Sequence, residues 1–142
     1  MLILCLAITI ADGVAIMHHS RLAGFIIDCQ DIAPSESVRF WSAALGMPER
    51  KSQANEDAGY ALLDTGAYGL HIETQRVSHE SRLHLDIESD DVEAEADRLE
   101  RLGATRVKKV RHWWVMQAPT GHRFCVVYCA EVANRPGANR WD

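Results

Sequence analysis

The sequence predicts an α+β domain in which two tandem β-α-β-β-β modules form one cupped, eight-stranded mixed sheet with helices on its convex side. Two observations support this prediction. Residues 82–88 alternate apolar and polar side chains without a break, which is typical of a strand with one face against a core. Residues 24–32 resemble residues 84–92, and both stretches continue into a helical pattern that ends on Leu-Gly. Two copies at an offset of 60 residues indicate a duplicated module rather than a solenoid.

Composition narrows the classes of protein to which the chain can belong. Its 142 residues are 47% hydrophobic and 25% charged, as in an ordinary soluble domain with one core. The net charge of −5, without a basic run, argues against a nucleic-acid partner. The apolar run at residues 2–10 is too short to span a bilayer, so no membrane partner is predicted. The four cysteines lack CxxC and zinc-finger spacing, which favours reduced thiols in a cytoplasmic protein.

Both ends of the chain are predicted to lie outside the repeated pattern. Residues 1–20 form an N-terminal extension whose apolar run is similar to part of a signal peptide, although no Lys or Arg precedes it. The extension could add a strand, or Met17 could be the natural start, and the sequence leaves both open. The domain itself is predicted over residues 21–130, with modules at about 21–76 and 82–130. Residues 131–142 are predicted to be a loose tail without a further strand.

The first module contains a strand, a helix and two further strand candidates. The strand covers residues 22–29, and Pro34 then suits the first turn of a helix. Gly46 ends that helix. Strand candidates follow at residues 59–64 and 68–75, joined by a short turn. The apolar stripe of the helix comprises Val38, Phe40, Trp41, Ala44 and Leu45.

The second module repeats this order. In its first strand, Leu83, Leu85 and Ile87 form the predicted core face, and the polar side chains between them face the other way. A helix follows over residues 90–102, with acids near its start and arginines near its end, as the helix dipole favours. Three more strands are predicted over residues 104–111, 113–117 and 123–129.

This order of elements resembles the vicinal oxygen chelate superfamily, and within it the single-domain glyoxalase-like and bleomycin-resistance-like proteins. The resemblance covers residues 21–130, and its order and spacing are more specific than any one motif. It implies a small-molecule ligand and a homodimer. The stretches that carry it are Leu22-Ala23-Gly24-Phe25 with Asp31, Phe40-Trp41 with Leu45-Gly46-Met47, His84-Leu85-Asp86, Leu102-Gly103-Ala104, and residues 114–126.

In metal-dependent members of the superfamily, four ligands come from the first and last strands of the two modules. The corresponding positions here are Gly24, Glu73, His84 and Cys125. Glycine has no side chain to bind a metal, and the cysteine stands where these enzymes usually carry glutamate. Because a catalytic ion normally takes three protein ligands, the resemblance predicts no functional metal. The alternative is one divalent metal ion bound by a rearranged set, Glu73, His84 and Cys125, with His71 as a further ligand.

Three functional hypotheses follow. The first is a metal-independent protein that binds a small organic molecule in the concave cleft. The second is a divalent-metal-dependent lyase, isomerase or dioxygenase, in which the metal polarises adjacent substrate oxygens and a carboxylate moves the proton. The third is a degenerate module that serves as an assembly partner. Gly24 separates the first two hypotheses, because it removes one of the inherited ligands.

The candidate site residues lie on strand faces that are expected to line the cleft. His84 and Glu73 are the candidates for catalytic groups. Titratable groups gathered on one concave surface are expected to perturb one another's pKa values. In a regular strand, one of Trp113 and Trp114 faces the cleft and the other faces the helix, and the sequence does not say which. The full predicted substrate-binding set is His71, Glu73, His84, Asp86, Trp113, Trp114, Met116 and Cys125.

Overall fold

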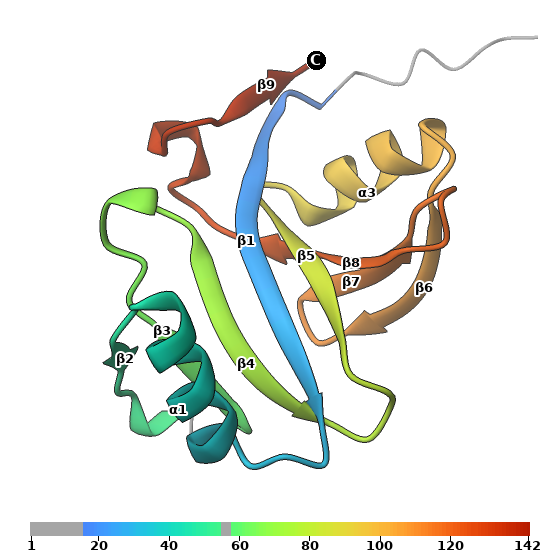
Figure 1. The fold of residues 1–142 in the computed structure, drawn as a ribbon. Helices are drawn as coiled ribbons and strands as arrows, with labels where there is room; N and C mark the ends of the chain where they lie inside the picture. Colours follow the sequence, from blue (N-terminus) through green and yellow to red (C-terminus); the bar gives the residue numbers. More distant parts are fainter. Residues whose placement is uncertain (1–15, 55–57) are drawn as a thin grey trace, which may run out of the picture.

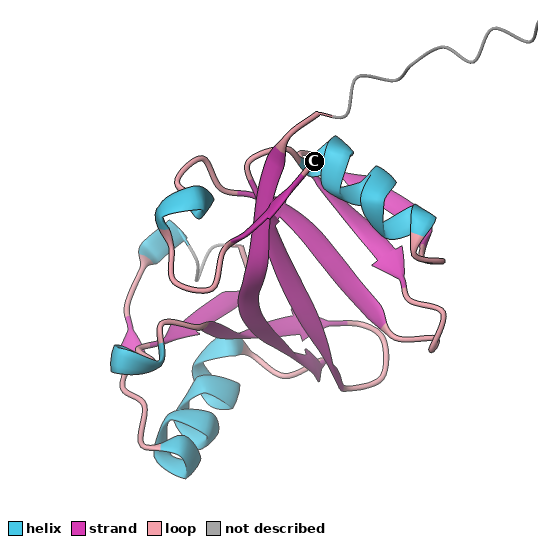
Figure 2. Ribbon diagram, turned by 90° about the horizontal axis from the view of Figure 1, so that it is seen from above, coloured by secondary structure: helices cyan, strands magenta, loops and turns pink. Residues whose placement is uncertain are grey.

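The structure, a computed structural model, describes residues 16–54 and 58–142 (Figures 1 and 2). In this part of the chain, no helix is long and apolar enough to cross a membrane. The elements, in chain order, are β1 (His18–Gln30), α1 (Pro34–Leu45), β2 (Glu49–Arg50), β3 (Tyr60–Leu63), the 3₁₀ turn η1 (Gly66–Tyr68), β4 (His71–Val77), β5 (Arg82–Ser89), α3 (Val92–Arg101), β6 (Thr105–Val110), β7 (Trp113–Gln117), β8 (Arg123–Tyr128), the 3₁₀ turn η2 (Val132–Asn134) and β9 (Asn139–Trp141).

The strands form one mixed sheet in the order β2-β3-β4-β1-β5-β8-β7-β6, and β9 pairs with the start of β1. β1 is parallel to β4, and β5 is parallel to β8, while the remaining pairs are antiparallel. Each half of the sheet is therefore one module, and the modules join where β1 and β5 pair within one chain. The predicted fold class is confirmed. The eighth strand is the two-residue β2, which lies in a stretch without a strand pattern.

Each helix packs against the convex face of its own module (Figure 1). Val38 of α1 is buried against Ala61 and Leu63 of β3. Ala96 of α3 is buried against Met116 of β7 and the neighbouring strand β8. The two small cores thus lie on the outer side of the sheet, and the concave side carries both polar and apolar side chains.

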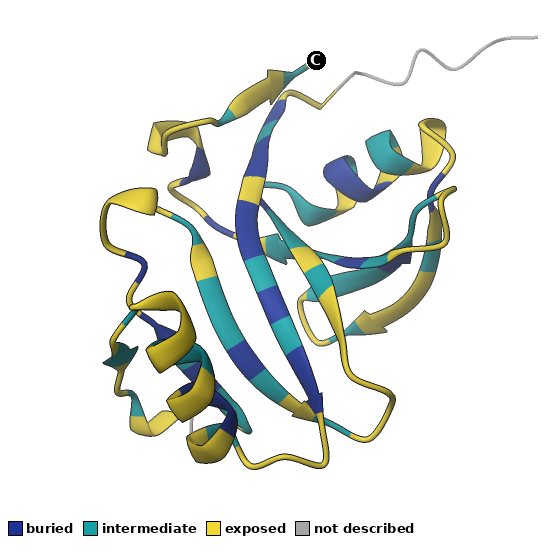
Figure 3. Ribbon diagram, in the orientation of Figure 1, coloured by how far each residue is buried: buried dark blue, intermediate teal, exposed yellow. Residues whose placement is uncertain are grey.

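Fewer apolar side chains are buried in the core than the sequence predicts. Phe40 and Leu45, expected on the apolar stripe of α1, are 63% and 45% exposed. Leu83 and Leu85, expected on the core face of β5, are 64% and 43% exposed, whereas Ile87 packs against the α3 core. The helices cause this difference, because α1 covers β3 and β4 while α3 reaches only the end of β5 (Figure 3). The outer face of the first half of β5 lies between them and stays exposed.

The end of the chain is part of the fold, so the prediction of a tail without a further strand is wrong. β9 pairs antiparallel with the first residues of β1. The indole Nε1 of Trp141 donates to Ser20 Oγ over 2.8 Å, and the guanidinium of Arg98 lies 3.9 Å from the centre of a ring of that tryptophan. β9 was missed because three residues after Pro136-Gly137 are too few to show alternation. β1 begins within the predicted N-terminal extension, of which residues 1–15 lie outside the described residues.

Candidate functional site

The cleft lies on the concave face, where side chains from both modules converge around a hollow of about 530 Å³. In the register of the sheet, Ile26 of β1 lies between Glu73 of β4 and His84 of β5. Two residues further along β5, Asp86 lies beside Cys125 of β8. Because alternate side chains of a strand share a face, all five point into the same hollow. Four of the predicted site residues are therefore brought together.

A buried carboxylate orients His84. Asp28 of β1 is 2% exposed, and its Oδ2 lies 2.9 Å from Nδ1 of His84. An ionised carboxylate can only accept, so Nδ1 carries the proton and Nε2 offers a lone pair to the cleft. The second oxygen of Asp28, Oδ1, is buried without a hydrogen-bond partner among the described residues. The pair thus presents one proton acceptor to the cleft, while the unsatisfied oxygen of Asp28 stays buried.

Asp86 is the second carboxyl group beside His84. Its Oδ1 lies 3.6 Å from Nε2 of the histidine, too far for a hydrogen bond, and has no other partner in the described part of the chain. Burial raises the pKa of Asp86 to about 6, and the charges of Glu73 and Asp28 act in the same direction against the opposing effect of the histidines. A carboxyl group with this pKa exchanges its proton close to neutral pH, which suits an acid or a base.

Cys125 is a poor nucleophile in this setting. Burial raises the pKa of its thiol to about 12, and the negative charges of Asp86 and Asp28 add to the effect. The thiol is therefore protonated near neutral pH and adds a weakly polar wall to the cleft.

His71 and Glu73 form a pair of their own at the side of the cleft. His71 Nε2 lies 3.0 Å from Glu73 Oε2. The hydrogen bond with Glu73 raises the pKa of His71, and burial opposes it. Glu73 lines the cleft, whereas the half-exposed His71 lies next to it.

The two adjacent tryptophans face opposite ways. Trp113 lines the cleft, while Trp114 points to α3, where its Nε1 lies 3.1 Å from the Glu93 carboxylate. Met116 shares the face of Trp114 and is fully buried in the α3 core. Trp114 and Met116 were predicted to line the cleft, but they do not. They lie two residues apart on β7 and therefore share the face that packs against α3. Tyr60 of β3 supplies another aromatic wall.

The inherited metal site does not fit this chain. A side chain at Gly24 would place its Cβ 1.7 Å from the carbonyl oxygen of His71, far closer than van der Waals contact. A rearranged set does fit, since ligand atoms of His84, Asp86 and Cys125 lie within 4.8 Å of one another. These nitrogen, oxygen and sulfur donors suit zinc, and Asp28 on the far nitrogen of His84 is a usual support for a histidine ligand. This set contains Asp86 in place of the predicted Glu73.

Sequence reasoning missed several polar residues of the cleft, among them Asp28 and Arg123. Asp28 interrupts an otherwise apolar strand, and a charge inside such a run is a signal of a paired or functional group. Arg123 of β8 lines the cleft, and its side chain has no ion pair or hydrogen bond within the described residues. It directly precedes Phe124, which pairs with Leu85, and the sequence does not reveal this register of β5 and β8.

Replacing Asp86 by asparagine is expected to stabilise the metal-free protein at alkaline pH. The folded pKa of about 6 lies above the ordinary value of 3.8, so folding favours the protonated form. The wild type therefore loses stability as pH rises from about 4 to 6, and the asparagine variant does not. Urea unfolding at pH 8 in chelator is expected to show a gain of about 1–3 kcal/mol, with little difference near pH 4.

The matched control for that prediction is Asp31→Asn. Asp31 is exposed, and its positive φ of 54° suits asparagine as well as aspartate. Equal stability of wild type and Asp86→Asn at pH 8 would contradict the assignment of a destabilising buried carboxylate.

The chain is similar to known proteins in fold. A family model described as "Glyoxalase-like domain" matches residues 24–127. No curated protein matches the chain. Methylmalonyl-CoA epimerase from Mycobacterium tuberculosis superimposes with a TM-score of 0.59 at 18% identity, over 81% of this chain and 92% of its own. The hypothetical protein BH1468 from Bacillus halodurans C-125 gives 0.56 at 14% identity, over 78% and 94%. A variant of the Streptomyces coelicolor methylmalonyl-CoA epimerase, in complex with 2-nitronate-propionyl-CoA, gives 0.52 at 18% identity, over 78% and 97%.

Proposed function

Because the chain belongs to the glyoxalase-like domain family of the vicinal oxygen chelate superfamily, we propose that it binds a small organic molecule in the concave cleft without a catalytic metal. The Asp28–His84 pair is the observation that supports this proposal most directly. A buried carboxylate holds the imidazole ring in place, and Nε2 is left without a hydrogen bond in the described residues. A preorganised acceptor between Trp113 and Tyr60 is what a polar group on a flat ligand needs.

The same arrangement suits proton transfer to and from the ligand. Nε2 of His84 can take a proton from an O–H group or from a C–H group next to a carbonyl, and Asp28 stabilises the imidazolium that results. The negative charge then grows on the ligand oxygen. Asp86 in its protonated form, which prevails below about pH 6, can donate to that oxygen. Structures of similar fold include enzymes named as epimerases, which supports a reaction of this kind without showing it for this chain.

The test is a screen of the metal-free protein by thermal shift in chelator, with small keto acids, aromatic ketones and thioesters. We expect hits whose binding weakens at least about tenfold in His84→Ala, since a hydrogen bond to a buried polar group is lost. His122→Ala is the matched control, because His122 lies in the exposed turn before β8. For a hit with an enolisable C–H group, deuterium exchange from solvent is expected with wild type and not with His84→Ala. Hits that bind His84→Ala as well as wild type would refute the proposal.

A second candidate function is a divalent-metal-dependent enzyme. It is favoured by the grouping of His84, Asp86 and Cys125, which are the residues that would hold the ion. When bound, such an ion would polarise adjacent oxygens of a substrate. Asp28 would keep its contact with Nδ1 of His84 and fix the ring for coordination through Nε2.

A cytoplasmic location and a homodimer are also part of the proposal. The outer face of β5 carries exposed Leu83 and Leu85, paired across β1 with Ile27 and Phe25, and a second copy could cover this apolar strip. Sedimentation equilibrium tests the homodimer, and a monomer at all concentrations would exclude it.

A further inference from the structure

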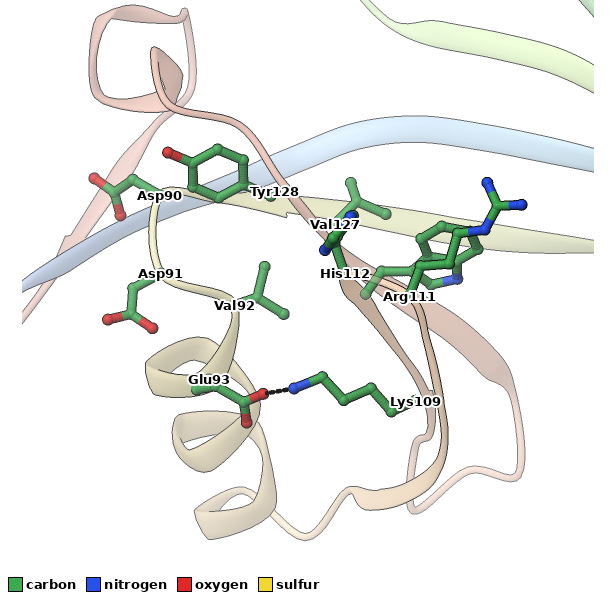
Figure 4. A pocket seen from close by; sticks show the side chains of 10 residues that line it. Asp90, Asp91, Val92, Glu93, Lys109, Arg111, His112, Val127 and Tyr128 are labelled. Atoms are coloured by element: carbon green, nitrogen blue, oxygen red, sulfur yellow. Dashed lines mark hydrogen bonds and ion pairs between the residues drawn. The ribbon is translucent and has the colours of Figure 1, made fainter.

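A second hollow lies beyond the end of the cleft, between the start of α3 and the hairpin that joins β6 to β7 (Figure 4). Its volume is about 690 Å³, larger than that of the cleft. Trp113 and Val127 line both hollows, so the two hollows are neighbours. On β8, Val127 lies two residues after Cys125 and therefore on the same face. The two hollows, which share Trp113 and Val127 as lining residues, are together called the groove.

The acids of the outer hollow already have partners. The Asp90 carboxylate accepts from the backbone N–H of His19 over 2.7 Å and lies 2.8 Å from that residue's Nδ1. Asp91 accepts from the backbone N–H of Ala94 over 2.9 Å and caps α3. Glu93 is paired with Lys109, as Figure 4 shows, and with Arg106. Two cations therefore compensate the charge of Glu93, whereas Asp90 and Asp91 are held in place by hydrogen bonds.

Two side chains at the hairpin tip have no such partners. Arg111 and His112 form the two-residue turn between the paired residues Val110 and Trp113. Both are exposed, and neither makes an ion pair or a side-chain hydrogen bond with any residue that the structure describes. The hairpin tip thus offers the Arg111 guanidinium and the His112 imidazole, both unpaired among the described residues, at a hollow that Trp113 also lines.

The backbone at the tip gives an independent indication. Arg111 has a φ of 51°, in the left-handed region that glycine or asparagine occupies at lower cost. A long cation at a strained position without internal partners among the described residues suggests a role outside the fold, because backbone strain tends to be retained where it serves function.

We propose that the ligand of the cleft is elongated and ends in an anionic group, a carboxylate or a phosphate, which Arg111 and His112 bind. This inference rests on the proposed function and adds the class of ligand. The polar head of the molecule lies at His84, its flat middle lies on Trp113, and its anionic end lies at the hairpin tip. The groove then selects amphiphilic organic anions over neutral molecules of the same shape.

Three probes of one shape test this proposal: the neutral 6-acetyl-2-methoxynaphthalene, 6-acetyl-2-naphthoate, and the phosphate ester of 6-acetyl-2-naphthol. Dissociation constants come from NMR titrations that follow the indole N–H of Trp113. We expect Arg111→Gly to weaken binding of the anionic probes about tenfold and to leave the neutral probe within about twofold, since one charge-assisted contact is lost. Glycine suits the positive φ, so this variant keeps the turn. The anionic probe that loses more affinity in Arg111→Gly shows whether the hairpin tip prefers a carboxylate or a phosphate.

The controls separate this inference from the proposed function. Arg39→Ala removes an exposed cation from α1 and is expected to change none of the three constants. Arg111→Lys keeps the charge and is expected to recover most of the affinity. If Arg111→Gly leaves the anionic probes unchanged while His84→Ala weakens all three, the anionic end is refuted and the proposed function stands. If no probe binds, or if His84→Ala changes nothing, both are refuted.

Discussion

Replacing Gly24 by alanine is expected to destabilise the protein by about 3 kcal/mol or more, or to prevent folding. The added Cβ would lie 1.7 Å from the carbonyl oxygen and 2.5 Å from the carbonyl carbon of His71. Both atoms belong to the backbone of β4, so no side-chain rotation relieves the overlap. The parallel pairing of β1 and β4 would have to open at the centre of the sheet. Urea unfolding followed by circular dichroism measures the effect.

The matched control is Gly121→Ala, in the exposed turn before β8. Its Cβ would meet nothing within 4 Å, but φ is 87°, so only the backbone conformation opposes it. We expect a loss of about 1 kcal/mol there. A Gly24→Ala variant as stable as this control would contradict the close approach of the two strands. The larger effect would also show that this chain has no room for a histidine at the first inherited ligand position.

Replacing Glu95 by alanine is expected to cost about 3–5 kcal/mol of folding stability, because it leaves the Arg98 guanidinium and the buried polar groups of His18 and Ser20 without their shared partner. Glu95 of α3 is 0% exposed. Its carboxylate lies 2.8 Å from Nε2 of His18, accepts from Ser20 Oγ over 2.9 Å, and accepts from Nε and Nη2 of Arg98 over 2.7 and 2.8 Å. Ser20 in turn accepts from Trp141, so the same carboxylate links α3 to β1 and β9.

The pH dependence gives a second readout for Glu95. Burial alone would raise its pKa, but the hydrogen bonds from Arg98, His18 and Ser20 outweigh burial and lower it. A lowered folded pKa contributes stability that is present above the ordinary value of 4.5 and is lost as pH falls through the folded pKa. The difference between wild type and Glu95→Ala is therefore expected to shrink in acid. Glu100→Ala, which removes an exposed partner of Arg106, is the control and is expected to cost about 0–1 kcal/mol.

The sheet could be predicted because alternation and repetition are local signals. Residues 82–88 showed which side chains of β5 share a face, and the structure places His84 and Asp86 in the cleft accordingly. The repeat predicted two modules, but it did not reveal that they pair with each other through β1 and β5 within one chain. How much of each sheet face the helices cover could not be predicted in the same way. Leu83 and Leu85 are on the convex face as expected, but the helices stop short of them.

The details of the site depended on pairing between strands that are far apart in sequence. Asp28 acts through a contact with His84, 56 residues away, and nothing local marks that partner. The sequence could not show which of Trp113 and Trp114 faces the cleft, because both faces of β7 carry apolar side chains. In the structure, Trp113 lies in the cleft and Trp114 packs against the core under α3. The possible ligand group contains Asp86 where the sequence predicted Glu73, because the register of β5 and β8 places Asp86 beside Cys125.

The most direct test of a metal-independent site is the metal content of protein purified without added metal, measured by elemental mass spectrometry on wild type, His84→Ala and His122→Ala. We expect far less than one equivalent of any transition metal in all three proteins, with no change caused by the His84 substitution. One equivalent of zinc, nickel, manganese or iron in wild type and His122→Ala, absent from His84→Ala, would contradict this account. It would instead identify a metal centre at His84, Asp86 and Cys125.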